Sequence, residues 1–485
     1  MKNDIIYCIS AGQLMTKKEN NPINKQNRYL NYGLLALAST LKQNGWNPIQ
    51  IHGHFDLPSG TLDNCICLGL MDFTMPLLIS IPSHYAVSWT KQFIMLAKQI
   101  NSKIKVIIGG RWVIGERPDL LKRLIPEADL IIPGIADSKI CEIIEAYAPS
   151  PQKTRSSMLK LKTQYPSLDY SLLFERSLYQ PSIEISRGCG MGCAFCMEKD
   201  NTRQPLKDAL FLSQELKANL LQDNLNPMTP YFEASHFVPN EKWINGLLMG
   251  MKKYGLNLNW RTEARVDTFK LDCLKGLAQS GLKVLDLGLE SASHKQLVKM
   301  NKSHNPSNYL SRASKLLRMA HEYDIKIKIN ILFSIGETDE TLSETDAWLE
   351  QHREFITGIS AGPQILFGWH ETIAPHIRML ESNGGSISHS PCEGITHINL
   401  SEEMDYEQSI ERANQLSRKY MTAEDYFYLK SFSYFPRNYS YQMFLKDIFK
   451  QSCDYSFSTL NTSQKAVMVN SPEILQNSMS LPVDE

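Results

Sequence analysis

Short apolar runs alternate with amphipathic stretches along residues 1–147 of the chain. The run from Ile5 to Ser10 is typical of a buried strand, and the leucines between positions 30 and 41 then recur at helical spacing. Gly45 follows them where a left-handed residue commonly ends a helix. Further strands are expected at 49–55, 65–73, 106–110 and 130–133. Parallel neighbours need crossover connections, so this β/α alternation predicts a doubly wound parallel sheet.

The alternation stops over residues 148–181, where prolines lie among polar side chains as they do in a linker. It restarts at Ser182, with helical patterns between successive apolar runs. Strands are expected at 182–186, 230–236, 258–264, 284–289, 325–333 and 359–367. Repeated β/α units predict a partial (β/α)6 barrel of the TIM type over residues 182–367, and the chemistry of such folds sits at the carboxyl ends of the strands.

Residues 368–485 change character and predict a small helical region that ends in a polar tail after Ser456. The segment from Tyr426 to Phe444 is dense in aromatic residues. We expect it to be a helical cap that packs on the barrel mouth, in preference to a surface on which substrate stacks.

Composition narrows the class of protein. The 485 residues carry 51 basic and 51 acidic side chains, so no overall field attracts a polyanion, which argues against a nucleic-acid partner. No stretch reaches the apolar length of a membrane-spanning helix, and the first residues lack the pattern of a secretory signal. We therefore expect a cytoplasmic protein with no membrane partner, whose cysteines are thiols or metal ligands.

Three cysteines stand close together in a glycine-rich segment directly after the first strand of the expected barrel. Cys189, Cys193 and Cys196 share this segment with Gly188, Gly190 and Gly192. Glycine tolerates left-handed backbone conformations and has no side chain to clash, so this loop can curve closely around a bulky inorganic group. Cysteines that only fill a core have no reason to share one such loop, and the other seven are scattered as small buried hydrophobes would be.

Thiolates bind both zinc and iron–sulfur clusters, and the number of protein ligands distinguishes these two kinds of site. Structural zinc takes four protein ligands, usually from two CxxC pairs, and this chain contains no second pair. Three thiolates on a 4Fe-4S cube leave one iron without a protein ligand, and an open coordination position is what a catalytic metal centre needs. The triplet therefore favours an iron–sulfur cluster.

The CxxxCxxC spacing, with Phe195 before the last cysteine, resembles the radical S-adenosylmethionine (SAM) superfamily over residues 182–367. The resemblance implies that Cys189, Cys193 and Cys196 ligate the cluster and that Phe195 packs near the adenine of SAM. It also implies that SAM chelates the open iron, that one electron breaks the sulfonium bond, and that the resulting 5'-deoxyadenosyl radical abstracts hydrogen. An electron donor such as flavodoxin or ferredoxin would then be a partner.

Weaker matches occur in the order of the class B branch of this superfamily. The segment from Trp260 to Asp267 resembles its third-strand signature, which implies that Arg265 pairs with the SAM carboxylate. Glu233, at the end of the second strand, stands where an acidic residue accepts the SAM ammonium, although the usual glycines beside it are absent. Gly288 to Ser291 resembles the fourth-strand motif, in which Glu290 and Ser291 would contact SAM. For each charged residue, the alternative is a solvated salt bridge at the barrel rim.

The first domain looks like the flavodoxin- or Rossmann-like cobalamin-binding domain of class B enzymes. The glycine pair Gly109–Gly110 at a strand end would let a corrinoid or its nucleotide tail approach the backbone. No DxHxxG segment follows the first strand to supply an axial histidine, and His52 and His54 look like ordinary strand residues. Cobalamin would then be bound without a protein nitrogen on cobalt.

Together these features predict a cobalamin-dependent radical SAM enzyme, a methyltransferase that acts on an unactivated carbon through methylcobalamin and the 5'-deoxyadenosyl radical. One alternative keeps the radical chemistry, as oxidation, cyclisation or rearrangement, and makes the first domain a vestigial or substrate-binding module. A second is a metal-bearing scaffold without catalysis. Small-molecule and peptide substrates both fit the sequence.

Overall fold

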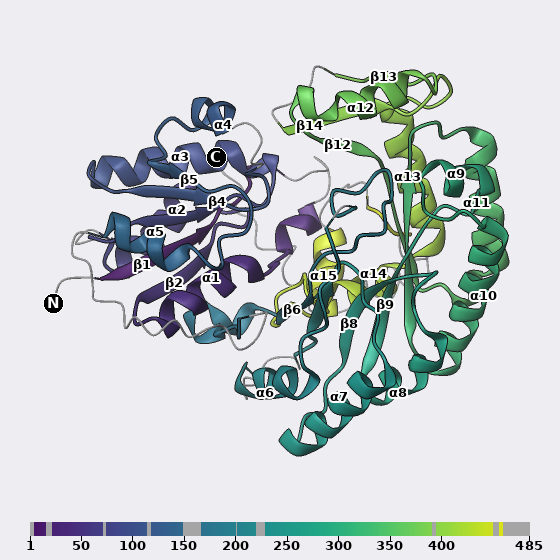
Figure 1. Ribbon diagram of the computed structural model, residues 1–485, viewed down its shortest axis with the longest axis horizontal. Helices are drawn as coiled ribbons and strands as arrows, with labels where there is room; N and C mark the ends of the chain where they lie inside the picture. The colour runs from purple at the N-terminus through teal and green to yellow at the C-terminus, as the bar shows by residue number, and fades with distance from the viewer. Residues whose placement is uncertain are drawn as a thin grey trace, which may run out of the picture.

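The computed structural model shows two bodies side by side, an N-terminal α/β domain and a barrel, with the C-terminal elements packed on the barrel (Figure 1). It describes residues 4–15, 22–70, 74–113, 118–148, 166–199, 201–219, 228–389, 394–449 and 455–458. Most of the expected linker, residues 149–165, lies outside the described residues, as does the polar tail from residue 459 onward. The rest of that linker belongs to the first domain, because Leu168 and Tyr170 are buried in its core.

The first domain is a five-stranded, wholly parallel sheet in the order β2-β1-β3-β4-β5, which confirms the doubly wound prediction. Its strands are β1 (Ile5–Ser10), β2 (Asn47–His52), β3 (Leu77–Ser80), β4 (Val106–Gly109) and β5 (Leu130–Ile131). Its helices are α1 (Tyr32–Gln43), α2 (Pro58–Cys67), α3 (Val87–Ile100), α4 (Pro118–Leu124) and α5 (Ile140–Tyr147). From β1 the chain adds β2 on one side of the sheet and then β3 to β5 on the other side. In doubly wound folds, ligands bind at such a switch point, so a crevice is expected at the carboxyl ends of β1 and β3.

One predicted strand is wrong. Residues 65–67 of the expected strand 65–73 are the last turn of α2, which starts with Pro58 at a position that favours helix initiation. Leu62 and Cys65 lie one helical turn apart and are both buried, so the apolar run was the inner face of a helix. The third strand comes ten residues later, at β3.

The second sheet holds six parallel strands in the order β11-β10-β9-β8-β7-β6, a partial barrel as expected. The strands are β6 (Ser182–Ser186), β7 (Tyr231–Ala234), β8 (Trp260–Arg265), β9 (Leu282–Glu290), β10 (Lys326–Phe333) and β11 (Gly358–Pro363). The helices around it are α6 (Ala209–Asn219), α7 (Glu241–Tyr254), α8 (Leu274–Gln279), α9 (His294–Lys299), α10 (Pro306–Glu322) and α11 (Asp339–Gln351).

Local signals fix where these helices begin and end. The Asn240 side chain accepts the Trp243 backbone N–H at the start of α7, and Gly255, with a φ of 63°, ends that helix. Thr338 and Thr341 form a reciprocal capping box at the start of α11. The caps thereby define the length of the helices that cover the strands.

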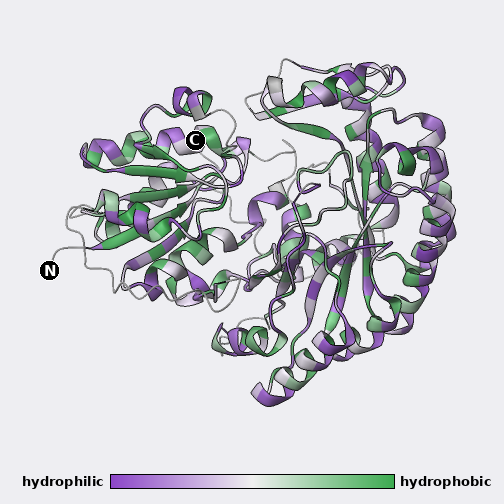
Figure 2. Ribbon diagram, viewed as in Figure 1, coloured by the Kyte–Doolittle hydropathy of each residue, from purple (hydrophilic) through white to green (hydrophobic). Residues whose placement is uncertain are grey.

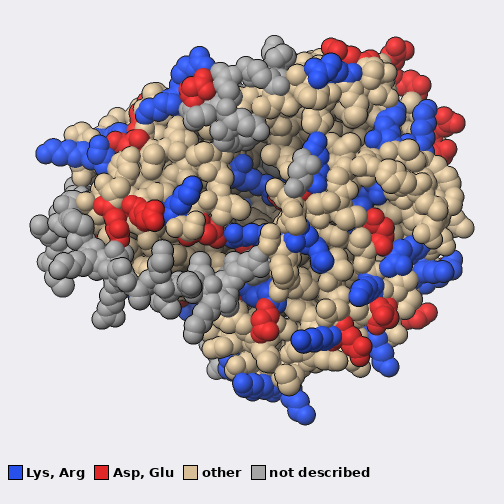
Figure 3. All heavy atoms as spheres, viewed as in Figure 1, with Lys and Arg blue, Asp and Glu red and all other residues tan. Residues whose placement is uncertain are grey.

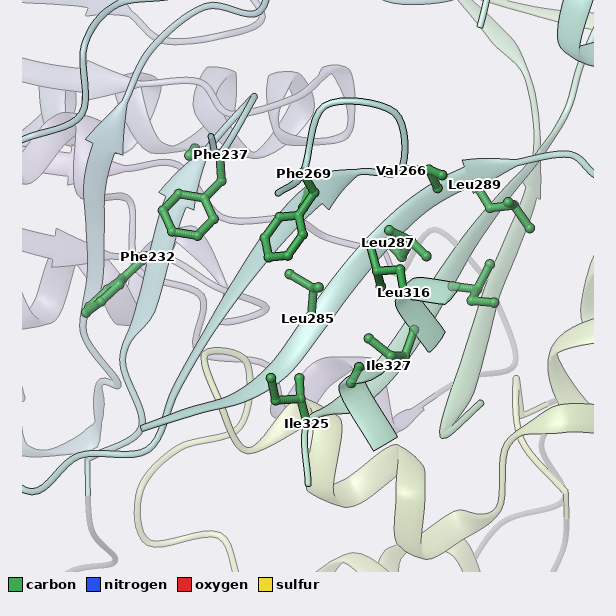
Figure 4. Close-up of a cluster of buried hydrophobic side chains, with 14 of the residues drawn as sticks. Phe232, Phe237, Val266, Phe269, Leu285, Leu287, Leu289, Leu316, Ile325 and Ile327 are labelled. Carbon is green, nitrogen blue, oxygen red and sulfur yellow. The ribbon is translucent and has the colours of Figure 1, made fainter. Parts of the chain in front are cut away.

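The barrel core lies between the strands and the outer helices. Along β10, Ile327, Ile329, Ile331 and Phe333 are buried while the residues between them face the lumen. Figure 4 shows Phe232, Leu285, Leu287 and Ile327 among the apolar side chains of this layer. Colouring by hydropathy shows the same separation, with apolar strands inside and polar outer helix faces (Figure 2).

The C-terminal region is not wholly helical. A small antiparallel sheet in the order β12-β14-β13 joins its helices. Its strands are β12 (Ile365–Gly368), β13 (Ser386–Ile387) and β14 (Gly394–Asn399), and its helices are α12 (His370–Glu381), α13 (Tyr406–Tyr420), α14 (Ala423–Lys430) and α15 (Tyr441–Phe449). The expected strand 359–367 is divided into β11 and β12, and β13 and β14 were not expected from the sequence.

The aromatic segment caps the end of the barrel opposite to the one predicted. Tyr426, Phe435 and Phe444 form a separate core that includes Val284, near the start of β9. The Leu429 carbonyl accepts a hydrogen bond from Arg261, near the start of β8. The cap therefore closes the amino-terminal ends of the strands and leaves the carboxyl ends uncovered by it.

The carboxyl edge of the first sheet faces the barrel. Arg187, just after β6, pairs with Asp137, in the loop after β5, at 2.9 Å. The Tyr29 hydroxyl of the first domain donates to Glu233 Oε1 of β7 at 3.2 Å. Figure 3 shows a hollow on this face between the two bodies, with Lys and Arg side chains at its edge. Across the described part of the chain, no helix combines the length and apolarity needed to span a bilayer.

A buried ion pair inside the barrel gives a direct test of this fold. Asp286 receives two hydrogen bonds from Arg261, at 2.6 and 2.8 Å, and lies 3.3 Å from Lys328. Asp286→Asn leaves both cations without a full counter-charge, so we expect a loss of roughly 3–5 kcal/mol in the free energy of unfolding. Asp324→Asn breaks only exposed pairs, with Lys283 and Lys326, and should cost less than about 1 kcal/mol. Urea unfolding measures both; equal losses would contradict the buried pair.

Candidate active site

The cysteine loop follows β6 at the carboxyl end of the barrel. Its curvature depends on Gly188, whose φ is 70° and where an added Cβ would lie 2.4 Å from the Thr202 carbonyl oxygen. The Cys189 N–H donates to the Asn201 carbonyl at 2.8 Å, so the two arms of the loop are tied together. The sequence expectation of a tightly wrapped loop at this edge is therefore met.

A segment from another part of the barrel also holds the loop. The Ala194 N–H donates to the Met300 carbonyl at 2.9 Å, and Asn301 Nδ2 donates to the Gly192 carbonyl at 2.7 Å. Residues 300–302, after α9, thus fix the cysteine loop against the carboxyl ends of β8 and β9.

Cys189, Cys193 and Cys196 line one cavity of about 140 Å3 together with Phe195. The opposite wall comes from β8, β9 and the residues after α9, with Glu263, Arg265, Glu290 and Lys302 as its charged members. The structure thereby brings together six predicted site residues from three parts of the sequence. They are the four residues of the loop, Arg265 of β8 and Glu290 of β9.

The donor set fits a cluster. Burial raises the pKa of the Cys189 and Cys196 thiols, so metal coordination would have to displace their protons. Among the described residues, no three His, Cys, Asp or Glu side chains converge on the position of one metal ion. The three thiols line one cavity, which fits ligands to three corners of a cube.

Hydrogen bonds already reach the sulfur atoms. The Glu198 N–H donates to Cys196 Sγ at 3.3 Å, and Arg265 Nη1 donates to Cys193 Sγ at 2.8 Å. The remaining donors of Arg265 go to Asp267, at 3.0 and 2.9 Å, and to the Lys302 carbonyl at 3.2 Å. Arg265 was expected to pair with the SAM carboxylate; in the structure its hydrogen bonds go to Cys193, Asp267 and Lys302.

Glu290 ends β9 with a φ of 68°, a strained value for glutamate at a cavity wall. Its Oε1 lies 3.1 Å from Lys302 Nζ. Sequence reasoning missed Lys302, for which the chain offers no spacing signal. It also missed Glu263, although the alternation of Arg261, Glu263 and Arg265 along β8 points all three into the lumen.

Two other predicted residues lie away from this cavity. Ser291 is buried, with its Oγ 3.2 Å from Thr345 Oγ1, and the Ser293 N–H donates to it. Glu233 Oε1 accepts from Ser182 Oγ at 3.0 Å and from Tyr29, and so faces the first domain. Contacts of Ser291 and Glu233 with SAM remain predictions.

Acidic side chains form a row across the barrel lumen. Strand register places Glu184 beside Glu233, and Glu263 beside Asp286. Arg187 neutralises Glu184, and Arg261 neutralises Asp286. Burial and the neighbouring Glu263 raise the pKa of Glu233 to about 8, while burial and Asp286 raise that of Glu263 to about 7. These two carboxyl groups are the uncompensated members of the row.

The glycine pair of the first domain lies close to the cysteine loop. Arg111, directly after Gly110, approaches Glu198 to 4.0 Å. An added Cβ at Gly109 would meet nothing closer than 3.5 Å, whereas at Gly110, with a φ of 107°, it would strike the Ile81 backbone at 2.6 Å. Gly110 is thus required by a turn, whereas a Cβ at Gly109 would make only an ordinary contact with the Ile132 carbonyl oxygen.

Both imidazoles near this edge are already engaged. His52 Nε2 accepts from the Asn31 N–H at 3.1 Å, and burial lowers the pKa of His52 to about 3. His54 Nε2 lies 2.8 Å from the Tyr179 hydroxyl. The Nε2 atom of each histidine thus already has a partner, whereas His52 Nδ1 is buried without a hydrogen bond in the described part of the chain.

Asn31 also closes the crevice between β1 and β3. Its Nδ2 donates to Ser10 Oγ at 3.1 Å and to Ser80 Oγ at 3.0 Å. These two serines end the strands on either side of the point where the sheet order reverses.

Solved structures with the same architecture are known. TsrM from Kitasatospora setae, a radical SAM methyltransferase determined with cobalamin and a [4Fe-4S] cluster, superposes with a TM-score of 0.56 at 14% identity, over 75% of this chain and 72% of that one. OxsB, a cobalamin-dependent SAM radical enzyme determined with aqua-cobalamin and SAM, gives 0.54 at 15% identity over 72% and 52%. This chain has the fold of the cobalamin-dependent radical SAM enzymes.

A curated relative gives a separate sequence match. An uncharacterised methyltransferase of Pyrococcus horikoshii is 22% identical over 278 residues, which are 53% of this chain and 59% of that protein. The match thus spans less than two thirds of the relative. No family model matches the chain.

A cluster held by the loop cysteines would receive a hydrogen bond from Arg265 through Cys193. An N–H donor to a ligating sulfur stabilises the reduced cluster, so Arg265→Met should lower the midpoint potential. Arg203→Met, an exposed arginine near the same loop, should leave the potential unchanged. A redox titration followed by electron paramagnetic resonance measures the difference; equal potentials would show that Arg265 does not reach the bound cluster.

The Glu233 carboxyl should make stability fall with rising pH. Its raised pKa means that the folded state holds the proton more tightly than the unfolded state, so its contribution is full below about pH 4.5 and is lost as the pH rises through about 8. Glutamine does not titrate, so Glu233→Gln does not lose stability in this way. Between about pH 4.5 and 8, the difference in free energy of unfolding between the variant and the wild type should rise by roughly 2–4 kcal/mol in favour of the variant. Urea unfolding at several pH values tests this, with the exposed Glu354→Gln as control; parallel curves would contradict it.

Proposed function

We propose that this protein is a cobalamin-dependent radical SAM methyltransferase that methylates an unactivated carbon. The observation that carries the proposal is the cavity in which three loop thiols face a wall of charged residues at the carboxyl ends of the barrel strands. Beside it lies the glycine edge of a doubly wound domain, joined to the cysteine loop by the approach of Arg111 to Glu198.

Each part of the site has a role in this proposal. Cys189, Cys193 and Cys196 would ligate the cluster, and Phe195 would pack near the adenine of SAM. Gly109, with the polar strand ends beside it, would hold cobalamin. When bound, these groups supply the electron that cleaves SAM and a carrier for the methyl group. The chain's own residues keep the cysteine loop in shape, orient the ligands and hold charge in a confined space.

The relatives support this assignment by what their descriptions state. TsrM is a methyltransferase that has been determined with its tryptophan substrate, and the Pyrococcus horikoshii protein is described as a methyltransferase. We propose a small-molecule or peptide substrate that enters between the two domains, and an electron donor such as flavodoxin or ferredoxin.

The products distinguish methyl transfer from other radical chemistry. The full chain, reconstituted anaerobically with iron and sulfide, is mixed with hydroxocobalamin, a reductant and SAM. We expect bound cobalt, and S-adenosylhomocysteine whose formation requires cobalamin, because one SAM methylates the reduced corrinoid. We also expect 5'-deoxyadenosine, which should disappear in Cys193→Ala and persist in Cys273→Ala, a buried cysteine beneath α7 and α8.

The alternative gives a different outcome. Formation of 5'-deoxyadenosine without retained cobalt or S-adenosylhomocysteine would contradict methyl transfer and leave a radical SAM enzyme with a vestigial or substrate-binding first domain. Absence of both products and of iron would overturn the enzyme assignment.

A further inference from the structure

We infer that the first domain opens away from the barrel at a contact between Trp112 and Trp369, and that ligands enter the junction there. The domain would turn about a second contact, which joins it to the aromatic cap of residues 426–444. The hollow of Figure 3 lies between the two bodies that this motion would separate. The motion goes beyond the proposed function, which concerns the chemistry at the junction.

The first contact, which we call the tryptophan contact, consists of Trp112, Trp369 and Gly394. Trp369 follows β12 and is buried in the hydrophobic core of the first domain, although it belongs to the C-terminal region. Its ring centroid lies 6.2 Å from that of Trp112, and the two ring planes meet edge to face at 70°. Four residues later, Ile373 of α12 packs in the core of the barrel. The start of α12 therefore joins the cores of the two domains.

The glycine pair of the first domain presents Trp112 to this contact. Gly110 turns the chain after β4 with a φ of 107°, and the Trp112 backbone N–H then donates to the Ile81 carbonyl at 3.1 Å. On the other side, an added Cβ at Gly394 of β14 would lie 2.9 Å from Trp112 Nε1. The indole is thus held between the end of the first sheet and the small C-terminal sheet.

The polar groups of the tryptophan contact are not satisfied. Trp112 and Trp369 are only 4% and 5% exposed, yet neither indole N–H has a hydrogen-bond acceptor in the part of the chain that the structure describes. A buried donor without an acceptor costs free energy, which is recovered when water reaches the donor. The closed contact is therefore less stable than the burial of two indole rings alone would make it.

The second contact, which we call the cap contact, joins the first domain to the aromatic cap. Ile23 is fully buried among the aromatic rings of that cap. The Arg28 backbone N–H donates to the Tyr434 carbonyl, and the Arg437 backbone N–H donates to the Leu178 carbonyl at 3.0 Å. Figure 1 shows β12 and β14 beside the upper part of the first domain and α15 beside its lower part. Because the cap contact combines apolar burial with backbone hydrogen bonds, it should persist while the tryptophan contact opens.

Elsewhere the two domains meet through ion pairs that water can reach. Arg187 and Asp137, which form one pair, have side chains that are 25% and 22% exposed, and Arg111 approaches Glu198 only to 4.0 Å. The hydrogen bond from the Tyr29 hydroxyl to β7 comes from the residue next to the cap contact. Exposed ion pairs contribute little to stability. They therefore offer little resistance to a rotation about the cap contact, a hinge motion of the kind that opens many two-domain proteins to ligands.

Exchange of the indole protons with deuterium measures this opening. Nuclear magnetic resonance follows these protons in the full chain, labelled with 15N in its tryptophan side chains, and replacement of each tryptophan by phenylalanine assigns the signals. We expect Trp112 and Trp369 to exchange at one common rate, because one motion exposes both, and about tenfold or more faster than Trp46. Trp46 is the matched control, since its N–H is also buried without a partner among the described residues but lies within the first domain. Two different rates, or exchange as slow as that of Trp46, would overturn the inference.

Gly394→Ala tests the same contact from the C-terminal sheet. The added methyl group should displace the Trp112 indole, so the exchange of Trp112 and Trp369 should accelerate together while that of Trp46 stays unchanged. Gly255→Ala is the control, because Gly255 also has a positive φ, of 63°, and an added Cβ there meets nothing within 4 Å. Wild-type exchange rates in Gly394→Ala would contradict the opening at this contact.

Uptake of hydroxocobalamin tests the entry route, and this part rests on the proposed function. Stopped-flow absorbance follows the binding of the corrinoid to the full chain. We expect Gly394→Ala to bind it faster than the wild type, and Gly255→Ala to bind it at the wild-type rate. Equal rates of uptake in a Gly394→Ala protein whose indoles exchange faster would overturn the entry route. A wild-type chain that binds no corrinoid would instead overturn the proposed cobalamin dependence and leave the opening motion, which exchange measures without it.

Discussion

The parallel direction of the barrel strands is the constraint on which the site depends. Six strands that run the same way bring their carboxyl ends to one edge, so the loop after β6 meets the ends of β8 and β9 although they are far apart in sequence. The doubly wound first domain obeys the same rule, and its carboxyl edge faces the barrel through Arg187 and Asp137. The carboxyl edges of the two sheets thereby face one another.

Charge in the lumen is arranged in levels along the strands. Near the amino-terminal ends, Arg261, Asp286 and Lys328 neutralise one another beneath the aromatic cap. At the same level of the strands as Asp286, Glu233 and Glu263 have no ion-pair partner among the described residues, and burial raises the pKa of each. At the cavity, Glu290 and Lys302 are paired with one another.

The sequence predicted what depends on short-range pattern. The apolar run of β10, the helical spacing of the leucines in α1 with Gly45 after it, and the cysteine spacing are local, and these elements and the three thiols lie where they were expected. It failed where an apolar run had two interpretations, as in α2, and where strands lie in segments of mixed polar and apolar residues, as in β13 and β14. The sequence could show that the aromatic segment forms a cap but could not show which end of the barrel it covers.

Individual roles at the site were harder to predict because they depend on which partner a side chain meets across the fold. Arg265 and Ser291 are bonded to groups that only the tertiary structure brings near them, and Lys302 reaches the cavity from a turn without any motif of its own. For the same reason, motif matching located the cysteine loop and gave weaker guidance on the charged residues, and the role of the cysteines as cluster ligands stays a prediction.

The central claim is that the three loop cysteines hold an iron–sulfur cube with one iron left open for SAM. The Mössbauer spectrum of the 57Fe-reconstituted full chain, recorded with and without SAM, tests it directly. The account predicts the spectrum of a [4Fe-4S] cluster in which SAM changes the signal of a single iron. A spectrum without such a cluster, or one that SAM leaves unchanged, would contradict it.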